Sequence, residues 1–295
     1  MSSPSTIQIE RIEVSKDSTI KLIFKERFHC VLIPLKNNKT TLCISSQVGC
    51  AMGCEFCLTA KMGFIRNLSK EEIIAQFEES LNYLKKYSKQ YSEESQLYAH
   101  QYITSIVFMG MGEPFNNYKN VISSIQYLNK EYSYPYKKIT ISTSGILPKM
   151  KEYVQTKFSS HLAISFHSAI QEKRDILMPY LKPFPIHELV DVCNEYSRQR
   201  KAGIMIEYIM IENFTDLEED LQALLEIELE KNTYINLIPL NGSMTIHEKE
   251  YYASSMKRCE EFKNALRQKG YKCFIRYNMG EDIEAACGML GEGRE

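Results

Sequence analysis

The sequence predicts an α/β fold: an incomplete (βα)6 barrel of the TIM type that follows a small N-terminal β appendage. Short, continuously apolar runs alternate with helical patterns, which is typical of a parallel sheet covered by helices on its outer face. The 295 residues are a normal length for one α/β barrel, and an apolar content of 44% is ample for a large core. A cysteine-rich loop follows the first strand of this pattern, at the end of the barrel where such folds carry their chemistry.

Residues 1–40 are expected to form the appendage. Apolar residues first alternate at Ile7, Ile9, Ile12 and Val14. Residues 20–24 and 28–33 are then predicted to be two strands, because β-branched and aromatic residues are frequent in them and the short charged turn 25–27 separates them.

Residues 41–295 are expected to form one barrel domain without an internal linker. Its strands are predicted at 41–45, 103–109, 138–142, 161–166, 204–211 and 234–240, with a last strand at 272–277. Its helices are predicted at 69 to about 86, 116–131, 149–157, 186–201, 215–230 and 247–269. The first helix opens with the capping box Ser69-Lys70-Glu71-Glu72. The polar residues 87–101 are expected to be a surface loop or a frayed helix end.

The cysteine-rich loop carries Cys50, Cys54 and Cys57 in a C-x3-C-x2-C pattern. Three thiolates on one short loop can hold three irons of a four-iron cluster and leave the fourth iron open to another ligand. A structural zinc site would need a fourth protein ligand and usually a second cysteine knuckle, which this sequence lacks.

Small polar residues follow four of the predicted strands. They are Gly112 and Glu113, Ser142 to Gly145, Ser165 to Ser168, and Asn241 with Gly242. Each segment alone is also compatible with ordinary turn chemistry. Because the strand ends of a barrel meet at one mouth, their conjunction with the cysteine loop favours a polar organic cofactor beside an iron–sulfur cluster.

Two further cysteines are candidates for nucleophiles. Cys43 precedes the cluster loop, and Cys287 stands among small residues in Ala285-Ala286-Cys287-Gly288, a frame that leaves a thiol accessible. The alternative for Cys287 is a buried small hydrophobe, which is the default for Cys30, Cys193, Cys259 and Cys273.

Composition limits the binding partners and the cellular compartment that we expect for this protein. The net charge of −1 argues against broad nonspecific nucleic-acid binding and leaves room for a local basic patch. No secretory segment and no long apolar run occurs, so we expect a cytoplasmic protein without a membrane contact, whose cysteines serve as ligands or redox residues. No feature of the sequence demands an oligomer, and a monomer is expected.

The motifs resemble those of the radical S-adenosylmethionine (SAM) RNA methyltransferases of the RlmN/Cfr family. The cluster loop reads T-L-C-I-S-S-Q-V-G-C-A-M-G-C-E-F-C-L-T-A-K-M-G-F-I-R-N-L. It is followed in collinear order by V-F-M-G-M-G-E-P, I-T-I-S-T-S-G-I-L-P, L-A-I-S-F-H-S-A, R-D-I-L-M-P, I-E-Y-I-M-I, I-N-L-I-P-L-N and G-E-D-I-E-A-A-C-G-M-L. The similarity covers about residues 19–290. It implies a barrel of the radical SAM kind.

The resemblance also implies a set of site residues and cofactors. Cys50, Cys54 and Cys57 would hold a [4Fe–4S] cluster. The positions that match the family's SAM contacts are Gly112, Glu113, Ser142, Ser165, Phe166, His167 and Asn241. Cys287 matches the cysteine that becomes S-methylated, and Cys43 matches the cysteine that later attacks its sulfur. Two SAM molecules per turnover, an RNA substrate and a reducing partner such as flavodoxin or ferredoxin follow from the same resemblance.

Three positions depart from the family pattern. The family carries a helical N-terminal extension that helps to dock RNA, whereas this chain begins almost at the β appendage. His29 stands where the family has a glutamate implicated as the base, and a histidine can accept a proton at neutral pH. Met279 stands where the family has a basic residue.

Three functions therefore remain open at this stage. The first is methylation of an adenine carbon, C2 in the first place, in 23S rRNA, with tRNA as an open second substrate. The second is a divergent radical SAM enzyme that applies the same two-cysteine chemistry to a different RNA or to another substrate. The third is a metal-cluster RNA-binding module without catalysis.

Overall fold

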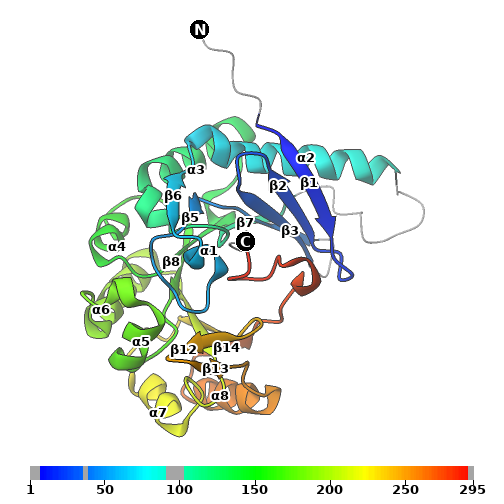
Figure 1. Ribbon diagram of the computed structural model, residues 1–295. Coiled ribbons are helices and arrows are strands. Elements are labelled where there is room, and N and C mark those ends of the chain that lie inside the picture. The colour runs from blue at the N-terminus through cyan, green and yellow to red at the C-terminus, as the bar shows by residue number, and fades with distance from the viewer. Residues whose placement is uncertain (1–6, 36–38, 91–102, 292–295) are drawn as a thin grey trace.

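The computed structural model describes residues 7–35, 39–90 and 103–291. Most of the predicted surface loop at 87–101 lies outside the described residues. A barrel-shaped sheet occupies the centre of the molecule, and most of the helices surround it (Figure 1).

The described strands of the main sheet run in the order β1-β2-β3-β4-β7-β8-β9-β10-β11-β14. Seven of them are parallel, namely β4 (Lys39–Cys43), β7 (Ser105–Phe108), β8 (Ile139–Thr143), β9 (His161–Ser165), β10 (Met205–Met210), β11 (Tyr234–Pro239) and β14 (Lys272–Ile275). The first six are the predicted (βα)6 unit, and β14 is the predicted last strand. Their side chains are largely buried, as expected for parallel strands covered on both faces.

The helices between the strands are α2 (Lys70–Gln90), α3 (Tyr118–Tyr132), α4 (Leu147–Val154), α5 (Gln171–Leu177), α6 (Ile186–Arg200), α7 (Glu218–Glu226) and α8 (Met256–Gln268). The predicted capping box opens α2, since Ser69 N donates to Glu72 Oε2 at 2.8 Å and Glu72 N donates to Ser69 Oγ at 3.2 Å. Short 3-10 turns lie at Pro114–Asn117, Tyr136–Lys138, Pro179–Leu181 and Glu281–Ile283.

The prediction of a helix at 247–269 is wrong for the first third of that range. A hairpin of β12 (Met244–Ile246) and β13 (Lys249–Tyr251) occupies this stretch, with His247 and Glu248 in the left-handed region at φ 48° and 64°. The helix begins only after Ser255, whose side-chain oxygen accepts from Arg258 N at 3.2 Å. A serine cap of this kind marks a helix start more firmly than the charged pattern before it.

The predicted appendage strands extend the barrel sheet. They are β1 (Ile9–Val14), β2 (Ile20–Phe24) and β3 (His29–Leu35), and each is antiparallel to the next one along the chain. Strand β3 is also antiparallel to β4, and this pairing places Val31 opposite Cys43. Cys30 lies against α2, because its sulfur is 3.5 Å from Ser80 Oγ. Since side chains alternate along a strand, His29 and Val31 share the opposite face with Cys43. The division of the chain into two domains at residue 40 stays a prediction.

A two-stranded ribbon frames the cysteine loop. It consists of β5 (Gln47–Gly49) and β6 (Phe64–Asn67), with the short α1 (Leu58–Lys61) between them. Gly49 has φ +69°, and a Cβ there would lie 1.8 Å from the carbonyl oxygen of Gly63, so only glycine fits this close crossing.

The longest helix among the described residues is α2, and neither it nor any other described helix has the length and apolar character that a membrane crossing requires.

Candidate active site

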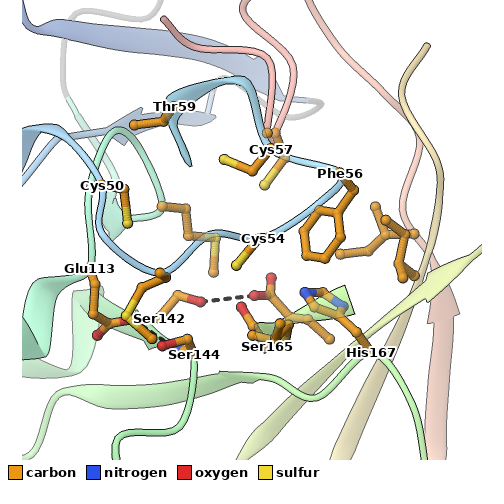
Figure 2. Close-up of a pocket in the computed structure, with 18 of the residues that line it drawn as sticks. Cys50, Cys54, Phe56, Cys57, Thr59, Glu113, Ser142, Ser144, Ser165 and His167 are labelled. Carbon is orange, nitrogen blue, oxygen red and sulfur yellow. Dashed lines mark hydrogen bonds between the residues drawn. The ribbon is translucent and has the colours of Figure 1, made fainter. Parts of the chain in front are cut away.

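The main pocket opens at the carboxyl ends of the parallel strands, where an α/β barrel places its chemistry. Figure 2 shows the three cysteines of the loop on one side of it, with Glu113, Ser142, Ser144, Ser165 and His167 facing them from the strand ends. Of the residues predicted from the sequence, the lining contains Cys50, Cys54, Cys57, Gly112, Glu113, Ser142, Ser165, His167, Asn241 and Cys287. Cys43, Phe166 and His29 are not in this lining.

The cluster loop is held by backbone contacts at both ends. Cys50 N donates to Gly63 O at 3.1 Å, Glu55 N donates to Leu177 O at 3.0 Å, and Leu58 N donates to Gly288 O at 2.7 Å. Burial raises the pKa of Cys50 to about 12 and raises the pKa of Cys54 well above its ordinary value. Buried thiols of this kind need a cation to become thiolates, and iron supplies one.

The three cysteines are a donor set that fits a four-iron cluster. Cys50, Cys54 and Cys57 line one pocket from one loop. Three thiolates can hold three irons of a [4Fe–4S] cluster and leave the fourth iron open to another ligand. Among the described residues, no three His, Cys, Asp or Glu side chains form a site for a single metal ion.

Glu113 is fixed at the end of β7. Its carboxylate accepts from Phe115 N at 2.9 Å and from Ser144 N at 2.7 Å. Burial nevertheless raises its pKa, so a cationic partner in the pocket would favour its charged form. The preceding Gly112 has φ +96°, and a Cβ there would lie 2.4 Å from the Cβ of Gln47. Gly112 is therefore required for steric reasons, whereas Glu113 supplies the carboxylate.

Several buried polar atoms of the pocket residues have no hydrogen-bond partner within the described chain. They are Ser144 Oγ, His167 Nδ1 and Asn241 Oδ1. An unsatisfied buried polar group costs about 1–3 kcal/mol. Three of them around one cavity indicate a site built for a polar organic ligand, and the sulfonium, amino acid and nucleoside of SAM match that chemistry.

The segment after β9 is shaped around Glu207. Phe166 N and His167 N both donate to the backbone oxygen of Glu207, at 2.9 and 3.0 Å, and His167 has φ 62°. Burial lowers the pKa of His167 to about 3, so its imidazole is neutral at pH 7. The ring stands edge-on to Phe56 of the cluster loop, with centroids 4.7 Å apart. The Phe166 side chain is buried in the core, so the segment offers its backbone and His167 to the pocket.

The two candidate nucleophiles come from opposite ends of the chain. Cys43 ends β4, and Cys287 lies in the segment after β14, where Asn241 Nδ2 donates to Cys287 O at 2.7 Å. Burial raises the pKa of Cys43 to about 12, and the Cys287 thiolate adds to this increase while Arg276 opposes it. Burial also raises the pKa of Cys287, again opposed by Arg276. The two sulfurs therefore interact electrostatically with each other and with one guanidinium.

Sequence reasoning missed Glu207, which lines the pocket, and Arg276, which lies outside the lining and pairs with Glu207. Ser142 Oγ donates to Glu207 Oε2 at 2.8 Å, and Arg276 Nη1 lies 3.6 Å from Glu207 Oε1. A signal for Glu207 was present, because it is the one charged residue in the apolar run 204–211. A carboxylate inside a buried strand needs a partner or a function.

His29 lies elsewhere. It lines a second depression together with Arg11, Lys21 and residues 282–284. Burial, reinforced by the charges of Lys21 and Arg11, lowers the pKa of His29 to about 4. The imidazole is therefore neutral at pH 7, and it faces the same side of the sheet as Cys43.

Comparison with known proteins agrees with this geometry. The Radical SAM superfamily model matches residues 44–227. The dual-specificity RNA methyltransferase RlmN of Desulfotalea psychrophila is 39% identical over 285 residues, which are 95% of this chain and 76% of that protein. The probable RlmN of Trichodesmium erythraeum is 36% identical over 97% of this chain and 79% of its own length.

A solved structure is similar over the same extent. The radical SAM methyltransferase from Sphaerobacter thermophilus superposes with a TM-score of 0.84 at 32% identity, covering 96% of this chain and 80% of that one. Barrel, cysteine loop and relatives therefore lead to one assignment: the chain belongs to the radical SAM superfamily and, within it, to the RlmN family of methyltransferases.

Proposed function

We propose that the enzyme methylates an adenine carbon, C2 in the first place, of 23S rRNA, through a methyl group carried on Cys287. What supports this best is that Cys287 lines the same pocket as the three cluster cysteines, while Cys43, the second thiol, has a pKa that burial raises and the charge of Cys287 raises further. A methyltransferase that moves methyl directly from SAM needs no such pair. RNA as the substrate is supported by the relatives, which are RNA methyltransferases.

The Cys287 thiolate starts the reaction. Its sulfur takes the methyl group of a first SAM by displacement, S-adenosylhomocysteine leaves, and the thiol proton passes to solvent. Arg276 favours this step, because its positive charge opposes the increase in the Cys287 pKa that burial causes. Cys287 is kept near the mouth by Asn241 and by the contact of Gly288 with the cluster loop.

When bound, the cluster and a second SAM supply the one-electron chemistry that activates the methyl group of Cys287 for addition to the adenine. Cys50, Cys54 and Cys57 would hold the cluster. Glu113 would hold the SAM amino group, while Ser142, residues 165–167 and Asn241 would hold the remainder of SAM. A flavodoxin or ferredoxin is the proposed source of the electron, and a monomer is the proposed working form.

The Cys43 thiolate ends the reaction. It attacks the sulfur of Cys287, so that a sulfur–sulfur bond forms while the bond from sulfur to the transferred carbon breaks. The carbon keeps the electron pair and takes a proton to become the methyl group. A two-electron reductant then restores both thiols. His29 takes the family's position for the base that removes the adenine proton, and its neutral imidazole is free to accept one.

One observation favours the second candidate function, the same chemistry on a different RNA or another substrate. A histidine whose pKa is lowered to about 4 is a weak base, and it does not line the main pocket. A substrate whose carbon loses its proton more readily would not need a strong base at position 29.

The deciding experiment is mass mapping of 23S rRNA and tRNA from cells with and without the gene. Loss of 2-methyladenosine at one position, restored by the wild-type gene and not by Cys287→Ala, is the expected result. Unchanged adenine methylation would exclude the RNA adenine assignment and leave the second candidate in place.

A further inference from the structure

Arg174 is a buried cation directly beneath the cluster loop. The residue belongs to α5 and has no exposed surface. Its Nη2 donates to Ser144 O at 2.8 Å and its Nε donates to Phe166 O at 3.2 Å. One guanidinium thereby ties together the loops after β8 and β9, both of which line the pocket or support it.

These bonds do not supply an opposite charge. Among the residues that the structure describes, no carboxylate forms an ion pair with Arg174; the charge of Asp175 acts on it only from beyond ion-pair distance, and Arg174 Nη1 is buried without a hydrogen-bond partner. A buried ion costs several kcal/mol unless an opposite charge accompanies it. Burial accordingly lowers the pKa of Arg174 to about 10.

The cluster loop is the anionic element next to it. Glu55 N, directly after Cys54, donates to Leu177 O one turn further along α5, at 3.0 Å. A Cβ on Gly53, directly before Cys54, would lie 3.5 Å from the ring of Pro179. The residues on either side of Cys54 therefore pack on the segment that carries Arg174.

We propose that Arg174 is the buried counter-charge of the iron–sulfur cluster and raises its reduction potential, so that the bound cluster accepts its electron more readily. This inference rests on the cluster-binding part of the proposed function. One electron from an external donor adds one negative charge to a site that already carries three thiolates. A fixed cation in a low-dielectric interior stabilises the reduced form more than the oxidised form.

The test compares Arg174→Gln, which removes the charge but keeps a donor, with Arg174→Lys, which keeps the charge but loses the planar fork. Arg200→Met is the matched control, because Arg200 also donates to backbone carbonyls, those of Val154 and Thr156, yet it sits at the end of α6. Each protein is reconstituted anaerobically with iron and sulfide and titrated with dithionite in the absence of SAM, with electron paramagnetic resonance as the readout.

At the potential that half-reduces the wild-type cluster, Arg174→Gln is expected to lower the ratio of reduced to oxidised cluster at least tenfold, which corresponds to about 59 mV for one electron. Arg174→Lys should stay within about threefold of wild type, and Arg200→Met should not change. A wild-type potential in Arg174→Gln would overturn the inference. A separate binding titration of that variant with SAM would then show, by weaker binding, that the charge pairs with the SAM carboxylate instead.

If Arg174→Gln does not fold, Arg174→Lys still decides, because a large negative shift with the charge retained would exclude a charge effect. These readouts need neither RNA nor methyl transfer. A protein that takes up no iron would count against the proposed function itself, whereas intact methylation with an unchanged potential would count only against the role of Arg174.

Discussion

Two walls of the pocket are built in different ways. The cofactor wall consists of the cluster loop at residues 50–57 and the strand-end residues Gly112, Glu113, Ser142, Ser144, Ser165 and His167. The thiol wall consists of Glu207, Asn241 and Cys287; Cys43 and Arg276 lie outside the lining, and each interacts electrostatically with Cys287. In the cofactor wall, Glu113 binds two backbone groups, and Arg174 behind the wall binds two more, those of Ser144 and Phe166; all these contacts are buried. In the thiol wall, the segment that carries Cys287 is attached to its surroundings through one bond each at the carbonyl oxygens of Cys287, Gly288 and Leu290.

The difference matches the tasks of the two walls. A cluster and its SAM need one fixed geometry, so multiple buried contacts are an advantage. In the proposed reaction Cys287 must approach a SAM methyl group, an adenine and Cys43 in succession. A segment held by few hydrogen bonds pays little free energy to move between these positions.

The largest effect is expected from Cys50→Ala, which removes one corner of the cofactor wall. Anaerobic reconstitution should bring wild-type protein to roughly four irons per chain and should leave the variant near background. Cys193→Ala is the control, because Cys193 is buried in α6 away from the pocket lining. Iron and sulfide analysis with the visible absorption spectrum is the measurement. Full iron uptake by Cys50→Ala would contradict the assignment of the loop.

Cys43→Ala tests the thiol wall without touching the cofactor wall. Because the attack on Cys287 cannot occur, product release should stop, and the protein should accumulate either methylated Cys287 or a covalent adduct with RNA. Intact-protein and peptide mass spectrometry distinguishes the two. Neither species in a variant that still binds the cluster would exclude the two-thiol mechanism here.

Arg276→Met should make Cys287 less reactive, because the variant loses the positive charge beside this thiol. One pKa unit is a typical effect of a neighbouring opposite charge, so the methylation of Cys287 by SAM should slow about tenfold at neutral pH. The pH profile of this half-reaction should move to higher pH, and Arg276→Lys should restore most of the rate. A loss of rate without a shift of the profile would assign Arg276 a packing role.

His29 lies beyond both walls, and its effect is expected on stability. Its folded-state pKa of about 4 is below the ordinary value of 6.5, so the unfolded chain binds the proton more tightly between these pH values. The stabilisation from a neutral His29 is complete above about pH 6.5 and is lost as the pH falls toward 4. Between pH 7 and pH 4.5, the free energy of unfolding of His29→Gln should therefore fall by about 2–3 kcal/mol less than that of the wild type.

Urea unfolding at a series of pH values measures this difference, and parallel pH curves would refute it. The same variant separates the proposed base from a structural histidine. Unchanged product formation by His29→Gln would remove His29 from the mechanism, whatever its effect on stability.

Much of the barrel could be predicted from the sequence because its signals are local. Buried parallel strands show as continuous apolar runs, and the start of α2 carries its own cap at Ser69. The start of α8 was predicted too early, although Ser255 caps it. The β12–β13 hairpin was missed because the two turn residues with positive φ, His247 and Glu248, are not glycines, so their residue types do not signal a turn. The ribbon of β5 and β6 was missed because each strand is only three or four residues long.

The sequence by itself determined the cluster loop, because three cysteines within one short segment must share a loop in any fold. It also determined the strand-end residues, since the ends of parallel strands meet at one mouth. The family resemblance already implied the pair Cys43 and Cys287. Only the tertiary structure decided which other distant groups gather at or behind the pocket: Glu207 with Arg276, and Arg174 with the carbonyl oxygens of Ser144 and Phe166. Their neighbourhood comes from the order and register of strands β4 to β14, and electrostatic pairing between such segments depends on distance in space, which no local pattern records.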